Sequence, residues 1–147
     1  MKVLIVEDGH EYIETMSRYL GEGIHLERAG DGIQALEMLG NEHWDVVFMD
    51  MRFDRAQRLL GEDPDLLDRF AGDSERLRRF LERHQGTYIA HAIRNSGHSI
   101  PILFSYDFGR ESARWAHLRE RLTSVAYVHD TAGPADVRTA LKELYSE

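Results

Sequence analysis

The sequence contains no cysteine among its 147 residues. This absence excludes disulfide bonds, thiolate zinc sites and cysteine nucleophiles, and it is typical of a reducing compartment, so we expect a cytoplasmic protein. Long apolar runs are also missing. The segment 1–10 reaches an acidic pair after only four apolar residues, which predicts neither a signal peptide nor a membrane-spanning helix.

Several common catalytic and metal-binding motifs are absent as well. The eight histidines show no H-x-x-x-H pair, and the sequence has neither a G-x-x-x-x-G-K nor a G-x-S-x-G motif. A zinc site, P-loop nucleotide hydrolysis and serine hydrolase chemistry therefore have no support. The net charge of −8 argues against unspecific binding to nucleic acid or to a membrane surface. We expect the partner to be a protein, a metal ion or a small molecule.

What the sequence does contain is a regular alternation of strand and helix patterns. Four short apolar runs rich in β-branched residues predict buried strands, at 2–7, 45–50, 100–105 and 124–129, and the more polar segment 24–29 predicts an edge strand. Apolar stripes at helical spacing lie between them and after the last. This alternation predicts one domain over 1–147 of the α/β class, with a flavodoxin-like doubly wound parallel sheet in the order 2-1-3-4-5.

Polar side chains gather where the predicted strands end. Glu7 and Asp8 follow the first strand, Asp50 ends the third and Ser105 ends the fourth. The carboxyl ends of parallel strands meet at one edge of the sheet, and ligands bind there in this architecture. Acids at adjacent strand ends repel one another unless they share a cation, and hard oxygen ligands suit Mg²⁺. The sequence therefore predicts a magnesium–carboxylate site.

The segments "VLIVEDG", "VVFMDM", "ILFSY" and "AYVHD" resemble, in order and at strand ends, the receiver domain of two-component response regulators. The resemblance implies a phosphorelay protein in which Asp50 accepts a phosphoryl group. It implies Mg²⁺ as cofactor, held by Glu7, Asp8, Asp50 and the backbone carbonyl of Arg52. It also implies that Ser105 hydrogen-bonds the phosphoryl group and that Tyr127 is the aromatic residue whose rotamer follows this hydroxyl.

The resemblance also implies partners. A histidine kinase or phosphotransfer protein would supply the phosphoryl group. We expect no attached output domain, so that output passes through protein–protein contacts, with a downstream protein or with a second copy in a homodimer. We expect neither nucleic acid nor membrane among the partners.

Two features depart from the receiver pattern. The position of the lysine that pairs with the phosphoryl oxygens is held by Asp130, and Thr131 replaces the proline that follows it. An acid at this place repels a phosphoryl dianion. His129 is expected to point away from the side taken by Asp130, because side chains alternate along a strand.

The second departure is a helical insertion over 54–85, between the third strand and a helix expected to begin at Gly86. Its apolar spacing predicts one short helix after Pro64 and a second one capped by Asp73 or Ser74, with a break at Gly72. We interpret the insertion as a small helical hairpin packed on the domain, with a lid or a partner-docking element as the alternative.

Two other functions stay open. Some receiver-like domains with an insertion at this place carry a Ser-x-Asn-x-x-Gly motif and have been proposed to process cyclic phosphates. Here Asp107 stands at the asparagine position, and Met51-Arg52 replaces the usual His-Asp. The first alternative is therefore an enzyme that acts on a cyclic phosphate substrate. The second is a pseudo-receiver that binds its partner independently of phosphorylation.

Overall fold

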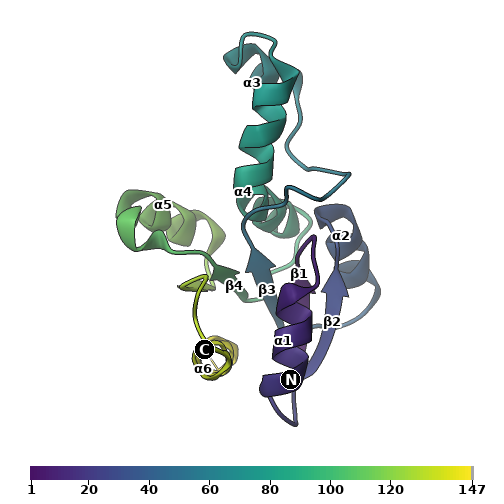
Figure 1. The fold of residues 1–147 in the computed structure, drawn as a ribbon, viewed down its shortest axis with the longest axis vertical. Helices are drawn as coiled ribbons and strands as arrows, with labels where there is room; N and C mark the ends of the chain where they lie inside the picture. The colour runs from purple at the N-terminus through teal and green to yellow at the C-terminus, as the bar shows by residue number, and fades with distance from the viewer. Residues whose placement is uncertain (147) are drawn as a thin grey trace.

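The structure, a computed structural model, describes residues 1–146. It is a five-stranded parallel sheet with helices on both sides and one helical arm (Figure 1). The elements are β1 (Lys2–Val6), α1 (Glu11–Tyr19), β2 (His25–Ala29), α2 (Gly32–Asn41), β3 (Val46–Asp50), α3 (Pro64–Arg69), α4 (Ser74–Asn95), β4 (Ile102–Ser105), the 3₁₀ turn η1 (Phe108–Arg110), α5 (Ser112–Leu122), β5 (Val125–Val128) and α6 (Pro134–Tyr145). None of the helices in this range has the length and apolarity that crossing a membrane would require.

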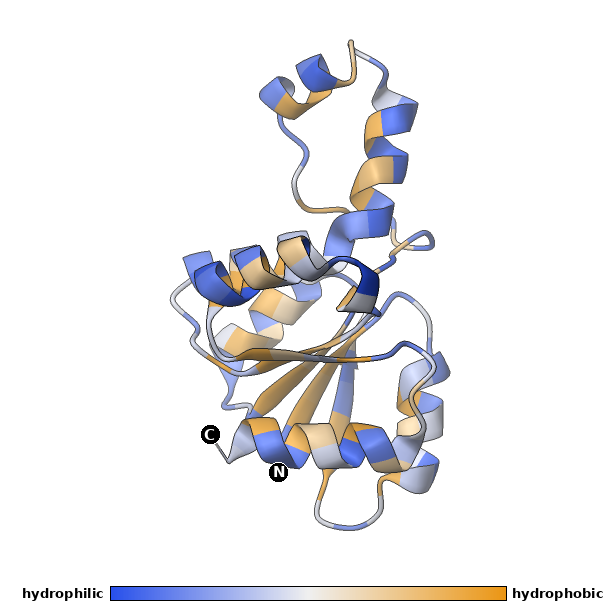
Figure 2. Cartoon of the chain, turned by 90° about the vertical axis from the view of Figure 1, so that its left-hand side faces the viewer, coloured by the Kyte–Doolittle hydropathy of each residue, from blue (hydrophilic) through white to orange (hydrophobic). Residues whose placement is uncertain are grey.

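The sheet confirms the predicted strands and their order. The strands pair in parallel as β2-β1-β3-β4-β5, and each predicted run coincides with a strand to within two residues. β3 is central and apolar because both of its faces are covered. Val47 and Met49 face the layer of α2, α4 and α5, whereas Val46 and Phe48 face α1 and α6, and all four are fully buried. Figure 2 shows these apolar strands between the two helical layers.

The insertion differs in two respects from the predicted hairpin packed on the domain, since its second helix does not end at Gly86 and the hairpin projects as an arm. The short helix after Pro64 is present as α3, and Asp73 caps the next helix by accepting a hydrogen bond from the amide of Arg76 at 3.1 Å. That helix does not end before Gly86. It continues to Asn95, so the second helix of the insertion and the helix expected at Gly86 are one helix of 22 residues. Its amino-terminal half projects from the sheet together with α3 (Figure 1).

α4 is joined to the chain that leaves β3. The amide of Gly86 donates to the carbonyl of Met51 at 3.0 Å, and the amide of Phe53 donates to the carbonyl of Glu82 at 2.8 Å. A regular α-helix would pair residues 82 and 86 with each other, and groups that enter this ladder bend a helix. Figure 2 shows that α4 changes direction between the arm and the sheet. Gly86 permits the approach, because a Cβ there would lie 2.2 Å from the carbonyl oxygen of Asp50.

Gln85 holds the insertion from inside. Its side chain is 1% exposed. Its Oε1 accepts from the amide of Leu60 at 2.7 Å, and its Nε2 donates to the carbonyls of Leu60 at 3.1 Å and Leu81 at 3.3 Å. The amide group therefore satisfies both backbone groups of Leu60, in the way that a neighbouring strand would.

We expect Gln85→Leu to destabilise the protein by about 2–4 kcal/mol, because it leaves two backbone groups of Leu60 without partners in a partly buried place. Denaturant unfolding measures the change. Gln34→Leu is the matched control, since Gln34 is exposed and also bonds a backbone amide, that of Gly30 at 2.8 Å. Equal losses in the two variants would contradict a clamp at Gln85.

Candidate functional site

Asp50 ends β3 at the carboxyl edge of the sheet, where the register places it opposite Ser105 of β4. A cavity of about 390 Å³ opens at this edge. Its lining residues are Tyr12, Asp50, Met51, Arg52, Ser105, Tyr106, Asp107, His129 and Asp130. The structure therefore brings Asp50, Arg52 and Ser105 together, as the sequence predicted.

Asp50 is a largely desolvated carboxyl group. Its Oδ1 accepts a hydrogen bond from the amide of Met51 at 2.8 Å. Burial raises the pKa of Asp50 from 3.8 to about 7, and the negative charges of Asp8 and Glu7 add to this effect, whereas the amides of Met51 and Arg52 oppose it. The metal-free site therefore favours a protonated Asp50 below neutral pH, and a cation nearby would favour the carboxylate.

Glu7 caps the first turn of helix α1. Its side chain is buried, and its two oxygens accept hydrogen bonds from the amides of Tyr12 at 3.1 Å and Ile13 at 2.9 Å. These amides belong to the first turn of α1, where helix donors lack partners inside the helix. Burial raises the pKa of Glu7. Glu7 is thus near Asp50 but is turned to the helix, and it does not line the cavity.

Asp8 lies beside the insertion. Its side chain is 3% exposed, and its Oδ2 accepts a hydrogen bond from the amide of Arg55 at 2.6 Å. The Arg55 guanidinium is 3.8 Å from Oδ1 of Asp8. The carbonyls of Asp8 and Gly9 accept hydrogen bonds from Arg28 of β2. Asp8 is thus fixed from two directions.

A magnesium ion at this edge requires oxygen donors near Asp50. No three histidine or acidic side chains within residues 1–146 are grouped so that they could hold a metal, which agrees with the turn of Glu7 toward α1. Mg²⁺, however, keeps several waters and binds through one or two carboxylates. Asp8 and Asp50 are close enough for the charge of one to raise the pKa of the other. With the carbonyl of Arg52, these carboxylates are the oxygen donors that the resemblance assigns to Mg²⁺, and of the two only Asp50 lines the cavity.

Ser105 already has a hydrogen-bond partner that the sequence did not reveal. Its side chain is 3% exposed, and its Oγ lies 2.8 Å from the hydroxyl of Tyr12. The Tyr12 ring packs edge-on against Phe48 at 5.1 Å between centroids. In the sequence, Tyr12 belongs to the apolar stripe between the first two predicted strands, a pattern that indicates packing and not a site. The one sequence signal that could have placed Tyr12 near the site is its position five residues after Glu7, in the first turn of α1.

Tyr127 lies apart from this contact. It is 36% exposed and packs edge-on against Phe108, at 5.4 Å, and Trp115, at 4.8 Å. These partners belong to η1 and α5. The predicted aromatic residue thus lies between β5 and α5, outside the set that lines the cavity at Asp50.

The prediction that His129 points away from Asp130 was wrong. β5 ends at Val128, so strand alternation does not extend to these residues. Both line the cavity. His129 Nδ1 lies 3.1 Å from Asp130 Oδ1, and His129 Nε2 lies 3.4 Å from Asp107 Oδ2. The side of the cavity that Asp107 and Asp130 line is therefore acidic.

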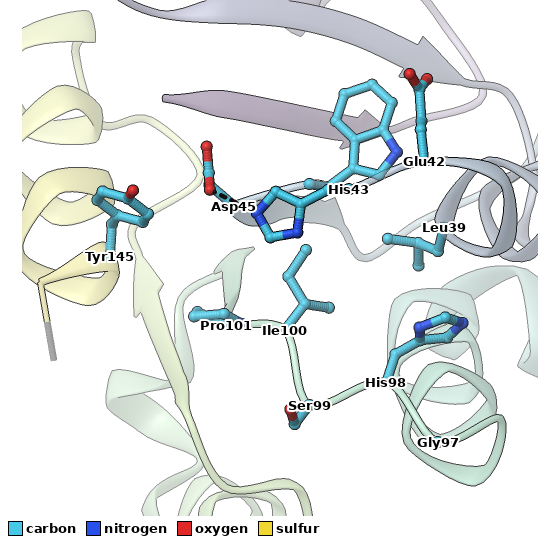
Figure 3. Close-up of a pocket in the computed structure, with 11 residues that line it drawn as sticks. Leu39, Glu42, His43, Asp45, Gly97, His98, Ser99, Ile100, Pro101 and Tyr145 are labelled. Atoms are coloured by element: carbon cyan, nitrogen blue, oxygen red, sulfur yellow. Dashed lines mark hydrogen bonds and ion pairs between the residues drawn. The ribbon is translucent and has the colours of Figure 1, made fainter.

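A larger cavity, of about 600 Å³, lies at the other edge of the sheet (Figure 3). The polar side chains at 42–45 in its lining already have structural partners. Asp45 accepts a hydrogen bond from the amide of Lys2 at 2.7 Å and pairs with His43 at 3.1 Å, and the indole of Trp44 donates to Met38. These contacts tie β1 and α2 to the start of β3. The carboxyl edge, where ligands of this architecture bind, remains the candidate site.

No family model and no curated protein matches the sequence. Among solved structures, the receiver domain of the Francisella response regulator 1452 is similar, with 16% identity and a TM-score of 0.66 over 99% of this chain and 96% of that one. The receiver domain of NtrX from Brucella abortus has 15% identity and a TM-score of 0.67, with 98% of each chain covered.

A third similar structure is the receiver domain of the sensor histidine kinase PA1611 from Pseudomonas aeruginosa PAO1, described with a magnesium ion in its active site cleft. It has 20% identity and a TM-score of 0.63, with 99% of this chain and 98% of that chain covered. Identities this low establish the fold alone. The chain has the flavodoxin-like fold of a response regulator receiver domain.

Proposed function

We propose that the protein is a phosphorelay receiver in which Asp50 accepts a phosphoryl group with Mg²⁺ as cofactor. The observation that carries the proposal is the placement of Asp50 in an open cavity at the carboxyl edge, beside the Ser105 hydroxyl and close to the charge of Asp8. The receiver fold of the similar structures supports it.

The reaction follows from these groups. A carboxylate oxygen of Asp50 attacks the phosphorus of a phosphohistidine, so that an O–P bond forms while the N–P bond breaks and the imidazole nitrogen takes up a proton. Mg²⁺, held by Asp8, Asp50 and the Arg52 carbonyl, would neutralise the phosphoryl oxygens and keep Asp50 ionised. The new dianion is an acceptor for the Ser105 hydroxyl, which leaves Tyr12 to reach it.

The charges of the residues that line the cavity disfavour the phosphorylated form of Asp50. Asp130 repels the phosphoryl dianion, and Arg52 is the permanently charged cation among the residues that line the cavity. This balance favours a second candidate, a pseudo-receiver that binds its partner without phosphate. The output contacts, with a histidine kinase, a downstream protein or a second copy, are common to both.

Incubation with Mg²⁺ and acetyl phosphate or phosphoramidate distinguishes the two. We expect the intact mass to rise by one phosphoryl group, and we expect Asp50→Asn to abolish the adduct, because the amide lacks the nucleophilic carboxylate. Asp54→Asn is the control, since Asp54 is an exposed acid close by in the sequence. An adduct that survives Asp50→Asn would overturn the assignment, and the absence of any adduct would favour the pseudo-receiver.

A further inference from the structure

Arg55 of the insertion lies against the acids that follow β1. Its amide donates to Asp8 Oδ2 at 2.6 Å. Its Nη2 lies 2.9 Å from Oε1 of Glu11 and 3.8 Å from Oδ1 of Asp8. The Asp8 side chain is 3% exposed and the Arg55 side chain 57%. A solvent-accessible guanidinium therefore lies beside a buried carboxylate.

The main chain provides room for this guanidinium. A Cβ at Gly9 would lie 2.2 Å from Nη2 of Arg55 and 2.1 Å from Oε2 of Glu11. Any side chain at this position would thus occupy the place of the ion pair. The side-chain ends of Arg55 and Glu11 thus lie over Gly9, in space that a Cβ would otherwise take.

The main chain around Arg55 is held by other contacts. Ala56 is 7% exposed, and its carbonyl accepts a hydrogen bond from Arg78 of α4 at 3.0 Å. Arg58 pairs with Asp31 through two hydrogen bonds, of 2.8 and 3.1 Å. Leu60 is bound by Gln85. The Arg55 side chain can therefore move away while the backbone of the insertion stays in place.

We propose that Arg55 is a built-in cation that occupies the acidic side of the magnesium site and that Mg²⁺ binds by displacing it. This inference rests on the proposed function, because it takes Asp8 as a metal ligand. A guanidinium 3.8 Å from Asp8 Oδ1 weakens the attraction of this carboxylate for Mg²⁺, because two cations near one carboxylate repel each other. Glu11, at 2.9 Å, is the closer partner of Arg55 and would keep the side chain after its displacement. The insertion thereby sets the magnesium affinity of the site.

Magnesium titration by isothermal calorimetry tests the proposal on the intact chain. We expect Arg55→Ala to lower the Kd for Mg²⁺ about tenfold. Solvent exposure of Arg55 weakens its effect, whereas the double charge of Mg²⁺ strengthens the repulsion between the two cations. Arg55→Lys keeps the charge and should stay close to the wild type. Arg58→Ala is the matched control, since Arg58 is a similarly exposed arginine of the insertion that pairs with Asp31 instead.

Each outcome has a defined meaning. Equal magnesium affinities of the wild type and Arg55→Ala would overturn the role of Arg55 and leave the magnesium site of the proposed function intact. An equal gain in Arg58→Ala would also overturn it, since the effect would then be one of net charge. If neither protein binds Mg²⁺, the inference and the magnesium site fail together. Loss of binding when Asp50→Asn is added to Arg55→Ala would support both.

Discussion

Asp50→Asn is expected to stabilise the metal-free protein at neutral and alkaline pH. Folding raises the pKa of this acid from 3.8 to about 7, so between these values the folded protein holds a proton that the unfolded chain has released. The stability that this proton contributes is complete below pH 3.8 and is lost as the pH rises through 7. At pH 8 the ionised carboxylate costs up to about 4 kcal/mol, and asparagine avoids this cost.

Denaturant unfolding of both proteins with a chelator, at pH 4 and pH 8, measures the effect. The two should differ little at pH 4, and the variant should be more stable at pH 8. Burial lowers the pKa values of His84 and His91, so these groups remove stability as the pH falls below 6.5, in the opposite direction. They act in both proteins and cancel in the difference. A difference independent of pH would refute a desolvated Asp50.

Gly86→Ala is expected to destabilise the protein by about 3 kcal/mol, because the new Cβ meets backbone atoms that no rotamer change can move. It would lie 2.2 Å from the carbonyl oxygen of Asp50 and 3.0 Å from Cα of Met51. Relief requires that α4 withdraw from the end of β3. Phosphoryl transfer to Asp50 should decrease in the same variant, since Asp50 would shift with its carbonyl.

Thermal and denaturant unfolding check this prediction against Gly40→Ala. Gly40 also lies inside a helix, α2, but a Cβ there meets no atom within 4 Å. Alanine at an unobstructed helix position stabilises by up to about 1 kcal/mol. The two substitutions should therefore have opposite signs. If Gly86→Ala stabilised the protein, the close contact between α4 and the end of β3 would be refuted.

The sheet could be predicted from the sequence because its signals are local. An apolar central strand such as 46–50 must be covered on both faces, and the alternation with amphipathic helices then leaves few topologies. The positions of Asp50 and Ser105 followed directly, since parallel strands end at one edge. This part of the site needed no knowledge of side-chain packing.

The remaining features depend on contacts between distant segments. The resemblance to receiver domains led us to expect a helix start at Gly86, and only the proximity of the Asp50 carbonyl explains the place of this glycine inside α4. The contact of Arg55 with Asp8 spans 47 positions. The turn of Glu7 toward α1 depends on the path of residues 8–12. No pattern in the sequence encodes these three arrangements.

Two hydrogen bonds join the middle of α4 to the chain after Asp50, one from the Gly86 amide to the Met51 carbonyl and one from the Phe53 amide to the Glu82 carbonyl. The arm is thus attached next to Asp50, and a tilt of the arm would pivot there. From Gly86 to Ser74 the helix extends roughly 18 Å at 1.5 Å per residue. A tilt of about 5° at this attachment would displace the Ser74 end of the helix by roughly 1.5 Å over this length. A small shift of the chain beside Asp50 would thus be amplified at the far end of the arm. A protein in contact with that end could distinguish the two positions.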